Sequence, residues 1–518
     1  MRRILFVLTC TLALSCASAA PQRTDLVLVN GKVFTADEAK PWAEAVAIRD
    51  DRILAVGTTV EIRAIADTAT RVIDLRGRTM VPGINDAHVH EPWSVPGTDI
   101  GITPDATVDV MLARLGSATA RHPSGTWLTG EVPVTLLDDP RLHRDTLDVA
   151  APQHPVRLGI LGGHAVLLNS AALRAWNVGE NQTDPRGGWY GRTDGRLNGW
   201  VYEHAAWAKM GDHASRQSDE TLVAAMNRFA AEAVRLGITT VQSMPLIPVD
   251  RLARLEPQTS VGLRWRWIDL MMAQVATEPR RAVKYILDGT PIERNAALRS
   301  PYADRPSMEG RLNYSVDEIS RFVEVAARSP HQLLVHVAGD AGLEELFAAM
   351  RRANVDWSGK RVRIEHGDFL GRYLHDAKEL GIVLVQNPSH FMLADLLQAR
   401  YGATRLRDFG AFRTAMERDI PVAIGSDGPI NPWLNVMFAA MHPANPDQRV
   451  TRERAVIAYT AGSAYAEMEE DEKGTIVPGK LADLAVLSQD IFAVPLEELP
   501  KTQSVLTIIG GRVVHDNR

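Results

Sequence analysis

Two histidines one residue apart, His88 and His90, follow a short apolar run that includes Met80, Val81 and Ile84. On a β-strand, residues i and i+2 point to the same face, so the two imidazoles would lie side by side at one strand end. Imidazole nitrogens are ligands that zinc and related divalent ions accept. The spacing therefore indicates a metal site, with two solvated loop histidines as the alternative.

Three further residues with metal-ligating side chains lie far along the chain, each at the end of another short apolar run: His336, His366 and Asp427. A chance scatter of core histidines would not select strand ends repeatedly. We therefore expect these side chains to meet His88 and His90 around bound metal. For each residue taken alone, a strand-end side chain bonded to a loop carbonyl is the alternative.

The middle of the chain alternates short apolar runs with helical patterns, which is typical of parallel strands connected by helices. After the strand that ends at His90, the expected strands cover residues 238–242, 263–268, 283–287, 333–336, 362–366, 382–386 and 422–425. One intervening helix begins with a capping box formed by Ser315 and Glu318. Eight such strands close a (β/α)8 TIM-like barrel, in which functional side chains lie at the C-terminal ends of the strands.

Both ends of the chain carry short strand patterns, and neither end has enough strands to bury a core alone. We therefore expect an α/β barrel beside one small β-sandwich built from both chain ends. The expected sandwich comprises residues 21–80 and 471–518, and the expected barrel comprises residues 81–470. Residues 91–218 form an insertion after the first barrel strand. It is far longer than an ordinary connection, and we expect it to overhang the barrel mouth as a lid.

Residues 1–20 have the features of a signal peptide: Arg2 and Arg3, a short apolar core at 4–14, and small residues at 17–19. The apolar run is too short to cross a bilayer comfortably as a permanent helix. We expect an exported protein, periplasmic or secreted, with no membrane span. A lipid anchor at Cys16 is the second alternative.

The composition is that of an ordinary globular protein, with 45% hydrophobic and 23% charged residues in a chain of 518. The formal net charge is −6 and no basic block is present, which argues against nucleic acid as a partner. A small-molecule substrate is the expected partner, and association into a homo-oligomer stays open.

The motif PGIxDxHxH at 82–90, the motif GSD at 425–427, and the strand-end His336 and His366 resemble the amidohydrolase superfamily of metal-dependent hydrolases. Other segments resemble its amidohydrolase-3 branch, which includes N-substituted formamide deformylases: GH at 163–164 with NSAAL at 169–173, VKYILDG at 283–289, and GTIxPGKxAD at 474–483. The resemblance covers nearly everything after residue 20. It implies a barrel with a β-sandwich made from both chain ends.

The resemblance also implies two divalent metal ions, expected to be Zn²⁺, with one on His88 and His90 beside Asp427 and the second on His336 and His366. Lys284 would bridge the two ions as a carboxylated lysine, because a carbamate made with CO₂ supplies two anionic oxygens. An ordinary salt bridge is the alternative for Lys284. If Lys284 is unmodified, the expected site is a single metal ion bound by the histidines and Asp427.

Such metals lower the pKa of bound water from about 15.7 towards about 7, which gives hydroxide at neutral pH. Asp427 would take the proton of this water and pass it to the leaving nitrogen. His164 is the candidate donor to the oxyanion, and a structural loop histidine is its alternative. The expected reaction is hydrolysis of an amide-type C–N bond in a non-peptide or small peptide-like substrate. A lactonase or phosphotriesterase on the same site, or a noncatalytic periplasmic metal- or ligand-binding barrel, is the alternative.

Four aromatic residues are candidates for the wall of the substrate pocket: Trp189, Tyr190, Phe391 and Trp433. Aromatic side chains of this size are also common in hydrophobic cores, so core packing is the alternative for each.

Overall fold

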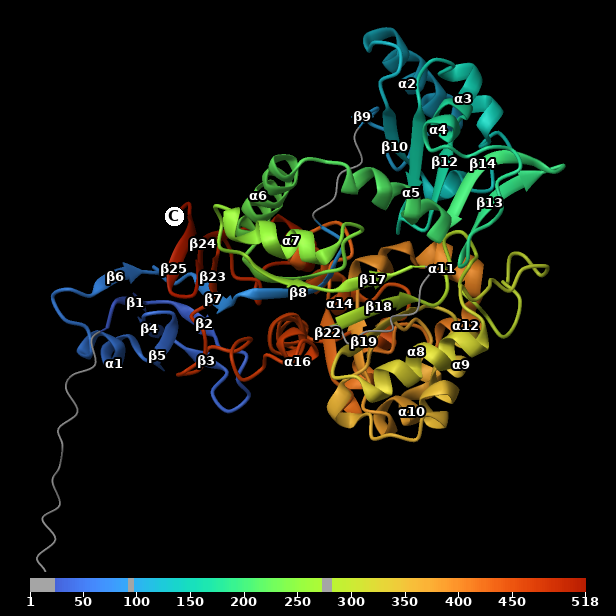
Figure 1. Cartoon of the computed structure of the whole chain (residues 1–518). Coiled ribbons are helices and arrows are strands. Elements are labelled where there is room, and N and C mark those ends of the chain that lie inside the picture. Colours follow the sequence, from blue (N-terminus) through green and yellow to red (C-terminus); the bar gives the residue numbers. More distant parts are fainter. Residues whose placement is uncertain (1–23, 92–96, 273–281) are drawn as a thin grey trace, which may run out of the picture.

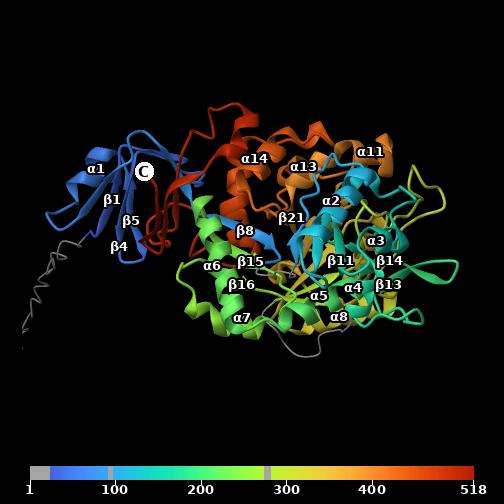
Figure 2. The same ribbon diagram turned by 90° about the horizontal axis from the view of Figure 1, so that it is seen from above.

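The computed structural model describes residues 24–91, 97–272 and 282–518 (Figure 1). The expected signal peptide and the lipid-anchor alternative at Cys16 lie outside the described residues. Within the described part of the chain, every helix is too short or too polar to cross a membrane. Three groups of elements are visible: β-sheets at the chain ends, a set of parallel strands in the middle, and a further sheet inserted after the first parallel strand (Figures 1 and 2).

The two chain ends meet in a pair of sheets that share one hydrophobic core. One sheet has the order β5-β4-β1-β6, and the other has the order β25-β24-β23-β7-β2-β3. The shared core contains Leu28 and Val46 from the first sheet and Leu484 and Leu506 from the second. The strands are β1 (Leu26–Val29), β2 (Lys32–Phe34), β3 (Trp42–Ala43), β4 (Ala45–Arg49), β5 (Arg52–Gly57), β6 (Arg71–Asp74), β7 (Thr79–Pro82), β23 (Leu484–Leu487), β24 (Ser504–Ile509) and β25 (Arg512–Asp516).

The middle of the chain contains two parallel sheets, of order β16-β15-β8 and β17-β18-β19-β20-β21-β22. Most of their residues are buried, as expected for strands covered on both faces, which read as nearly continuous apolar runs. The strands are β8 (Ile84–Val89), β15 (Ile238–Ser243), β16 (Arg264–Trp267), β17 (Asp269–Met271), β18 (Ala282–Ile286), β19 (Gln332–Val337), β20 (Arg363–His366), β21 (Val383–Gln386) and β22 (Val422–Ile424).

The two parallel sheets are connected at both edges. At one edge β16 and β17 are separated by Ile268 alone, and its N–H donates to the Ser243 carbonyl over 2.8 Å. At the other edge the Asp427 N–H donates to the His88 carbonyl over 2.8 Å. A Cβ atom at Gly425 would collide with His88, so the close approach of β22 to β8 requires glycine at this position.

Helices follow most of the parallel strands and cover them (Figure 1). The predicted capping box is present at the start of α8, where the Ser315 and Glu318 side chains each accept a hydrogen bond from the other's backbone N–H. The helices of this part are α6 (Asp219–Arg235), α7 (Val249–Leu255), α8 (Val316–Arg328), α9 (Asp340–Arg352), α10 (Leu374–Glu379), α11 (Ala394–Tyr401), α12 (Ala403–Leu406), α13 (Phe412–Glu417), α14 (Pro432–Met441), α15 (Arg452–Ile457) and α16 (Ser463–Ala466), and α1 (Thr59–Ala64) packs on the N-terminal strands.

The inserted segment has a sheet and a hydrophobic core of its own. Its sheet order is β13-β14-β12-β11-β10-β9. Leu115 of α2 and Leu128 and Leu158 of the sheet belong to its core. The elements are β9 (Thr98–Asp99), α2 (Val108–Arg121), β10 (Leu128–Val132), α3 (Arg144–Ala150), β11 (Val156–Ile160), β12 (Ala165–Leu168), α4 (Ser170–Ala175), β13 (Gly188–Thr193), β14 (Arg196–Glu203) and α5 (His204–Ser215).

Candidate metal centre

His88 and His90 lie at the C-terminal end of β8, and each ring is held through its Nδ1 atom. Nδ1 of His88 lies 2.5 Å from Oε2 of Glu365, and Nδ1 of His90 lies 2.9 Å from the Met244 carbonyl oxygen. Because both partners are acceptors, each Nδ1 carries the hydrogen and each Nε2 presents a lone pair. The two Nε2 atoms lie 3.5 and 3.3 Å from Oδ1 of Asp427.

Asp427 and His366 approach the same point from the ends of two other strands. Both have positive φ angles, 48° and 68°, so the chain turns sharply where β22 and β20 end. The ligand atoms of His88, His366 and Asp427 all lie within 4.8 Å of one another. The structure therefore brings together side chains that are hundreds of residues apart in the sequence.

The electrostatics of this cluster fit a divalent cation. Burial, with the nearby Lys284 charge, lowers the pKa of His88 to about 4, so its imidazole is neutral at pH 7. Burial alone would raise the pKa of Asp427, but His88 and His90 outweigh burial and hold that pKa well below its usual range. Neutral nitrogen lone pairs and an ionised carboxylate thus converge on one point. Their repulsion is relieved by a bound cation, and these are donors that zinc prefers.

Lys284 and His336 complete the group of six predicted ligands. Nζ of Lys284, in β18, lies 2.9 Å from Nε2 of His88, and burial lowers the pKa of this lysine to about 8. The His336 ring, in β19, has its centroid 4.5 Å from that of His366, and the His366 centroid lies 5.1 Å from that of His88. No predicted ligand is left remote from the others.

A second buried cluster lies beside the first and contains the predicted oxyanion donor, His164. Nδ1 of His164 lies 3.0 Å from Oε1 of Glu203, and the ligand atoms of His164, Glu203 and Glu293 lie within 4.8 Å of one another. The His164 ring centroid is 4.8 Å from that of His336. Burial raises the pKa of Glu203 well above its usual range and that of Glu293 to about 7.

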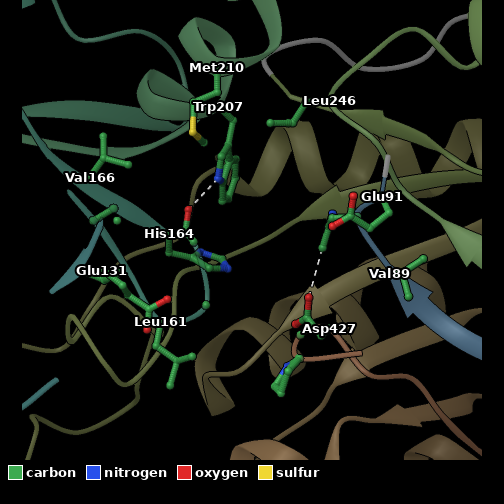
Figure 3. Close-up of a pocket in the computed structure, with 18 of the residues that line it drawn as sticks. Val89, Glu91, Glu131, Leu161, His164, Val166, Trp207, Met210, Leu246 and Asp427 are labelled. Atoms are coloured by element: carbon green, nitrogen blue, oxygen red, sulfur yellow. Dashed lines mark hydrogen bonds and ion pairs between the residues drawn. The ribbon is translucent and has the colours of Figure 1, made fainter. Parts of the chain in front are cut away.

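Both clusters open into one cavity of about 820 Å³ between the parallel strands and the inserted segment (Figure 3). In Figure 3, His164 and Asp427 face this space from opposite sides. The inserted segment contributes much of the wall, including Thr129, Glu131, Arg157, Val166, Trp207 and Met210.

The four aromatic candidates lie outside the lining of this cavity. Trp433 is fully buried and its Nε1–H donates to the Leu236 carbonyl over 3.1 Å. Phe391 stacks on the buried ring of His442. Trp189 stacks on a tyrosine of the neighbouring strand, and Tyr190 belongs to a hydrophobic cluster of the insertion. Their surroundings support packing rather than substrate contact.

Besides Glu203 and Glu293 of the second cluster, three functional candidates were missed from the sequence: Glu365, Arg363 and His390. Glu365 holds His88 and is itself held by Arg363, with Nε to Oε1 at 2.8 Å; both charged side chains are fully buried. The available signal was the pair of charged residues alternating within an otherwise apolar strand. Nε2 of His390 lies 3.8 Å from Oδ2 of Asp427, and its signal was its position just after the expected strand at 382–386.

Known proteins resemble this chain along almost its whole length. The sequence pattern of the Amidohydrolase family matches residues 71–515. The N-substituted formamide deformylase of Arthrobacter pascens is 28% identical over 536 residues, with 95% of this chain and 98% of that protein aligned. Protein LONG AFTER FAR-RED 3 of Arabidopsis thaliana is 26% identical over 556 residues, with 95% and 91% aligned.

A solved structure agrees with the fold. The structure of an uncharacterized metal-dependent hydrolase from Pyrococcus horikoshii OT3 superposes with a TM-score of 0.71 at 21% identity, and it covers 92% of this chain and 99% of that one. The family match, which spans most of the chain, carries the assignment. This chain belongs to the amidohydrolase family and is a hydrolase.

Proposed function

We propose that this protein is a metal-dependent hydrolase that cleaves an amide-type C–N bond in a small, non-peptide or peptide-like molecule. The observation that carries the proposal is the convergence of His88, His90, His366 and Asp427, whose imidazole and carboxylate groups are ligands that zinc accepts. The similarity to a protein named N-substituted formamide deformylase supports the C–N bond class.

We further propose that the parallel strands form one closed (β/α)8 barrel, with β16 and β17 counting together as its third strand. The connections at both edges of the two parallel sheets support this closure. The sheets of residues 21–80 and 471–518 would form the β-sandwich, and 91–218 would be a lid on the barrel of 81–470. Export to the periplasm or medium is proposed from the signal-like residues 1–20.

The proposed metal assignment places one Zn²⁺ on His88 and His90 with Asp427, and a second on His336 and His366. Lys284 would bridge them as a carbamate. Its low pKa supports this modification, because CO₂ reacts with the neutral amine and burial makes that form accessible near neutral pH. Bound zinc would supply a lowered pKa for water and would polarise a substrate carbonyl.

The protein's own residues would move the protons. Asp427 is ionised at neutral pH, so its carboxylate can accept a proton from the attacking water and deliver it to the leaving nitrogen. Burial raises the pKa of Glu203 well above its usual range and so favours its protonated form, whose O–H can donate a hydrogen bond to Nδ1 of His164. Nε2 of His164 then carries a hydrogen, which is the form required to stabilise an oxyanion.

The test is a substrate panel with matched variants. The full-length, zinc-loaded protein is assayed with an N-alkylformamide, a lactone and an aryl phosphotriester. We expect formamide cleavage, loss of activity on chelation, and a loss of at least about a hundredfold in kcat for Asp427→Asn with much of the zinc retained. Preferential turnover of the lactone or phosphotriester would favour the alternative activity. Metal binding without any turnover would favour a binding protein.

A further inference from the structure

Arg157 is a positively charged side chain in the cavity wall for which the described residues supply no counter-charge. Its Nε atom is buried and has no hydrogen-bond partner among the described residues, and its Nη1 atom lies 4.0 Å from the Met210 sulfur. Thioether sulfur is a weak acceptor. By contrast, three buried arginines of this chain face carboxylates: Arg144 faces Glu180, Arg294 faces Asp138, and Arg363 faces Glu365.

Arg157 is half-buried, and its Nε atom is fully withdrawn from water without an acceptor, which is costly to the fold. A guanidinium stays protonated at neutral pH, so it cannot escape the cost of burial by losing its charge. Burial lowers the pKa of Arg157 to about 10, and no neighbouring carboxylate offsets this effect. Retaining such a charge inside a substrate cavity makes sense where a ligand supplies the missing anion.

The position of Arg157 places it away from the metal centre but in the same cavity. Arg157 and Gly159 alternate along β11 and both line the cavity, and the strand leads through residues 161–163 to His164. The strand from 157 to 160 spans about 10 Å, at roughly 3.3 Å per residue. Apolar side chains of Trp207, Met210 and Leu246 line the cavity as well.

We propose that Arg157 binds a carboxylate at the far end of the substrate, so that the natural substrates are amides with an apolar body and a terminal carboxylate. This inference rests on the hydrolytic function proposed above, because it assumes that the scissile bond lies at the metal centre. It adds the class of substrate, which the ligand residues alone do not define.

Glu131 is the competing group, because it lines the same cavity on the neighbouring strand. Its strand partner is Gly159, while Arg157 is paired with Thr129, and no ion pair joins Glu131 to Arg157. Glu131 is exposed, so water can solvate its carboxylate, whereas the Nε–H of Arg157 is buried without an acceptor. The unsatisfied donor of this wall is therefore the guanidinium.

The experiment compares two probes that differ only in terminal charge, 6-formamidohexanoate and 6-formamidohexanamide. With the full-length, zinc-loaded protein, we expect kcat/KM to be about tenfold to a hundredfold higher for the carboxylate, the usual effect of a charge-assisted hydrogen bond. Arg157→Met should remove this preference to within about twofold by raising KM while kcat is kept. The readout is the ratio of the kcat/KM values for the two probes, measured for each variant.

Two controls separate recognition from folding. Because Arg157 has no partner to lose, Arg157→Met should leave the melting temperature unchanged or raise it. Glu131→Gln should keep the preference for the carboxylate. Equal turnover of both probes by the wild type, a preference that survives Arg157→Met, or a preference abolished by Glu131→Gln would each overturn the proposal.

Failure of the hydrolytic function is recognised separately. If neither formamide is cleaved, the proposed activity fails, and calorimetric titration of the same two compounds into the zinc-loaded chain still tests Arg157. Tighter binding of the carboxylate that is lost in Arg157→Met would then support the anion site. Equal binding of the two compounds would refute it.

Discussion

Replacing Glu365 by Gln should weaken metal binding although Glu365 is not itself a proposed ligand. Its Oε2 atom lies 2.5 Å from Nδ1 of His88, and Arg363 holds the same carboxylate. Burial would raise the pKa of Glu365, but Arg363 and His88 outweigh burial and hold it at about 2, so the group is an anion. This charge fixes the orientation of the His88 ring and makes its Nε2 a stronger donor to metal.

The expected loss of zinc affinity follows from replacing the charged hydrogen bond between Glu365 and His88 by a neutral one. A hydrogen bond to a charged group contributes about 1.5–3 kcal/mol and a neutral one about 0.5–1.5 kcal/mol. Glu365→Gln keeps the shape and loses the charge, so about 1–1.5 kcal/mol is lost, or roughly tenfold in zinc affinity. Loss of such supporting groups typically costs about 10- to 100-fold in affinity, which includes this value.

The assay is a competition titration of the zinc-loaded protein with a chelator of known affinity. Asp340→Asn is the matched control, because Asp340 is also a buried, ion-paired carboxylate, 2.8 Å from Arg372, and contacts none of the proposed ligands. We expect weaker zinc binding for Glu365→Gln and wild-type binding for Asp340→Asn. Unchanged affinity in Glu365→Gln, or an equal loss in both variants, would refute the reasoning.

Two further predictions concern stability. Burial lowers the pKa of His442 from 6.5 to about 4. As the pH falls from 6.5 to 4, the His442 imidazole therefore binds a proton in the unfolded chain but stays neutral in the folded chain. The stabilisation is complete above pH 6.5, and on the order of 3 kcal/mol is lost by pH 4. His442→Asn should flatten this part of a denaturation curve measured against pH, and an unchanged slope would contradict it. Trp433→Leu should lower the free energy of unfolding by about 3 kcal/mol and leave KM unchanged, because Trp433 is a core residue; a raised KM with wild-type stability would contradict this.

The proposed ligand residues could be selected from the sequence because local geometry constrains where they lie. The alternation of a strand places His88 and His90 on one face, and the ends of apolar runs mark His366 and Asp427. The same locality explains why the capping box of Ser315 predicted the start of α8.

Contacts between distant segments could not be derived in this way. Glu365 reaches His88 across 277 residues, and only the order of the strands brings them together. Trp433 was a candidate for the cavity wall because it follows β22, but α14 directs it into the core against Leu236. The exposure of Arg157 to the cavity depends on how the insertion packs over the parallel strands, which no local pattern specifies.

The sequence pattern also failed to predict that the third parallel strand is interrupted. The apolar run predicted one strand at 263–268, whereas the structure has β16 and β17 on either side of Ile268. The first part pairs with β15 and the second with β18. The break lets one stretch of chain join two sheets, which depends on both neighbours and not on the run itself.

The central claim is that six side chains at or near the ends of five parallel strands hold two metal ions in one cavity. An anomalous-scattering map of crystals of the zinc-loaded protein tests it most directly. The account predicts two anomalous peaks, one beside Nε2 of His88 and His90 and one beside His336 and His366, and ordinary electron density from the same crystals that extends from Lys284 Nζ to both. A map without a peak among these residues, or one with zinc bound elsewhere, would contradict it.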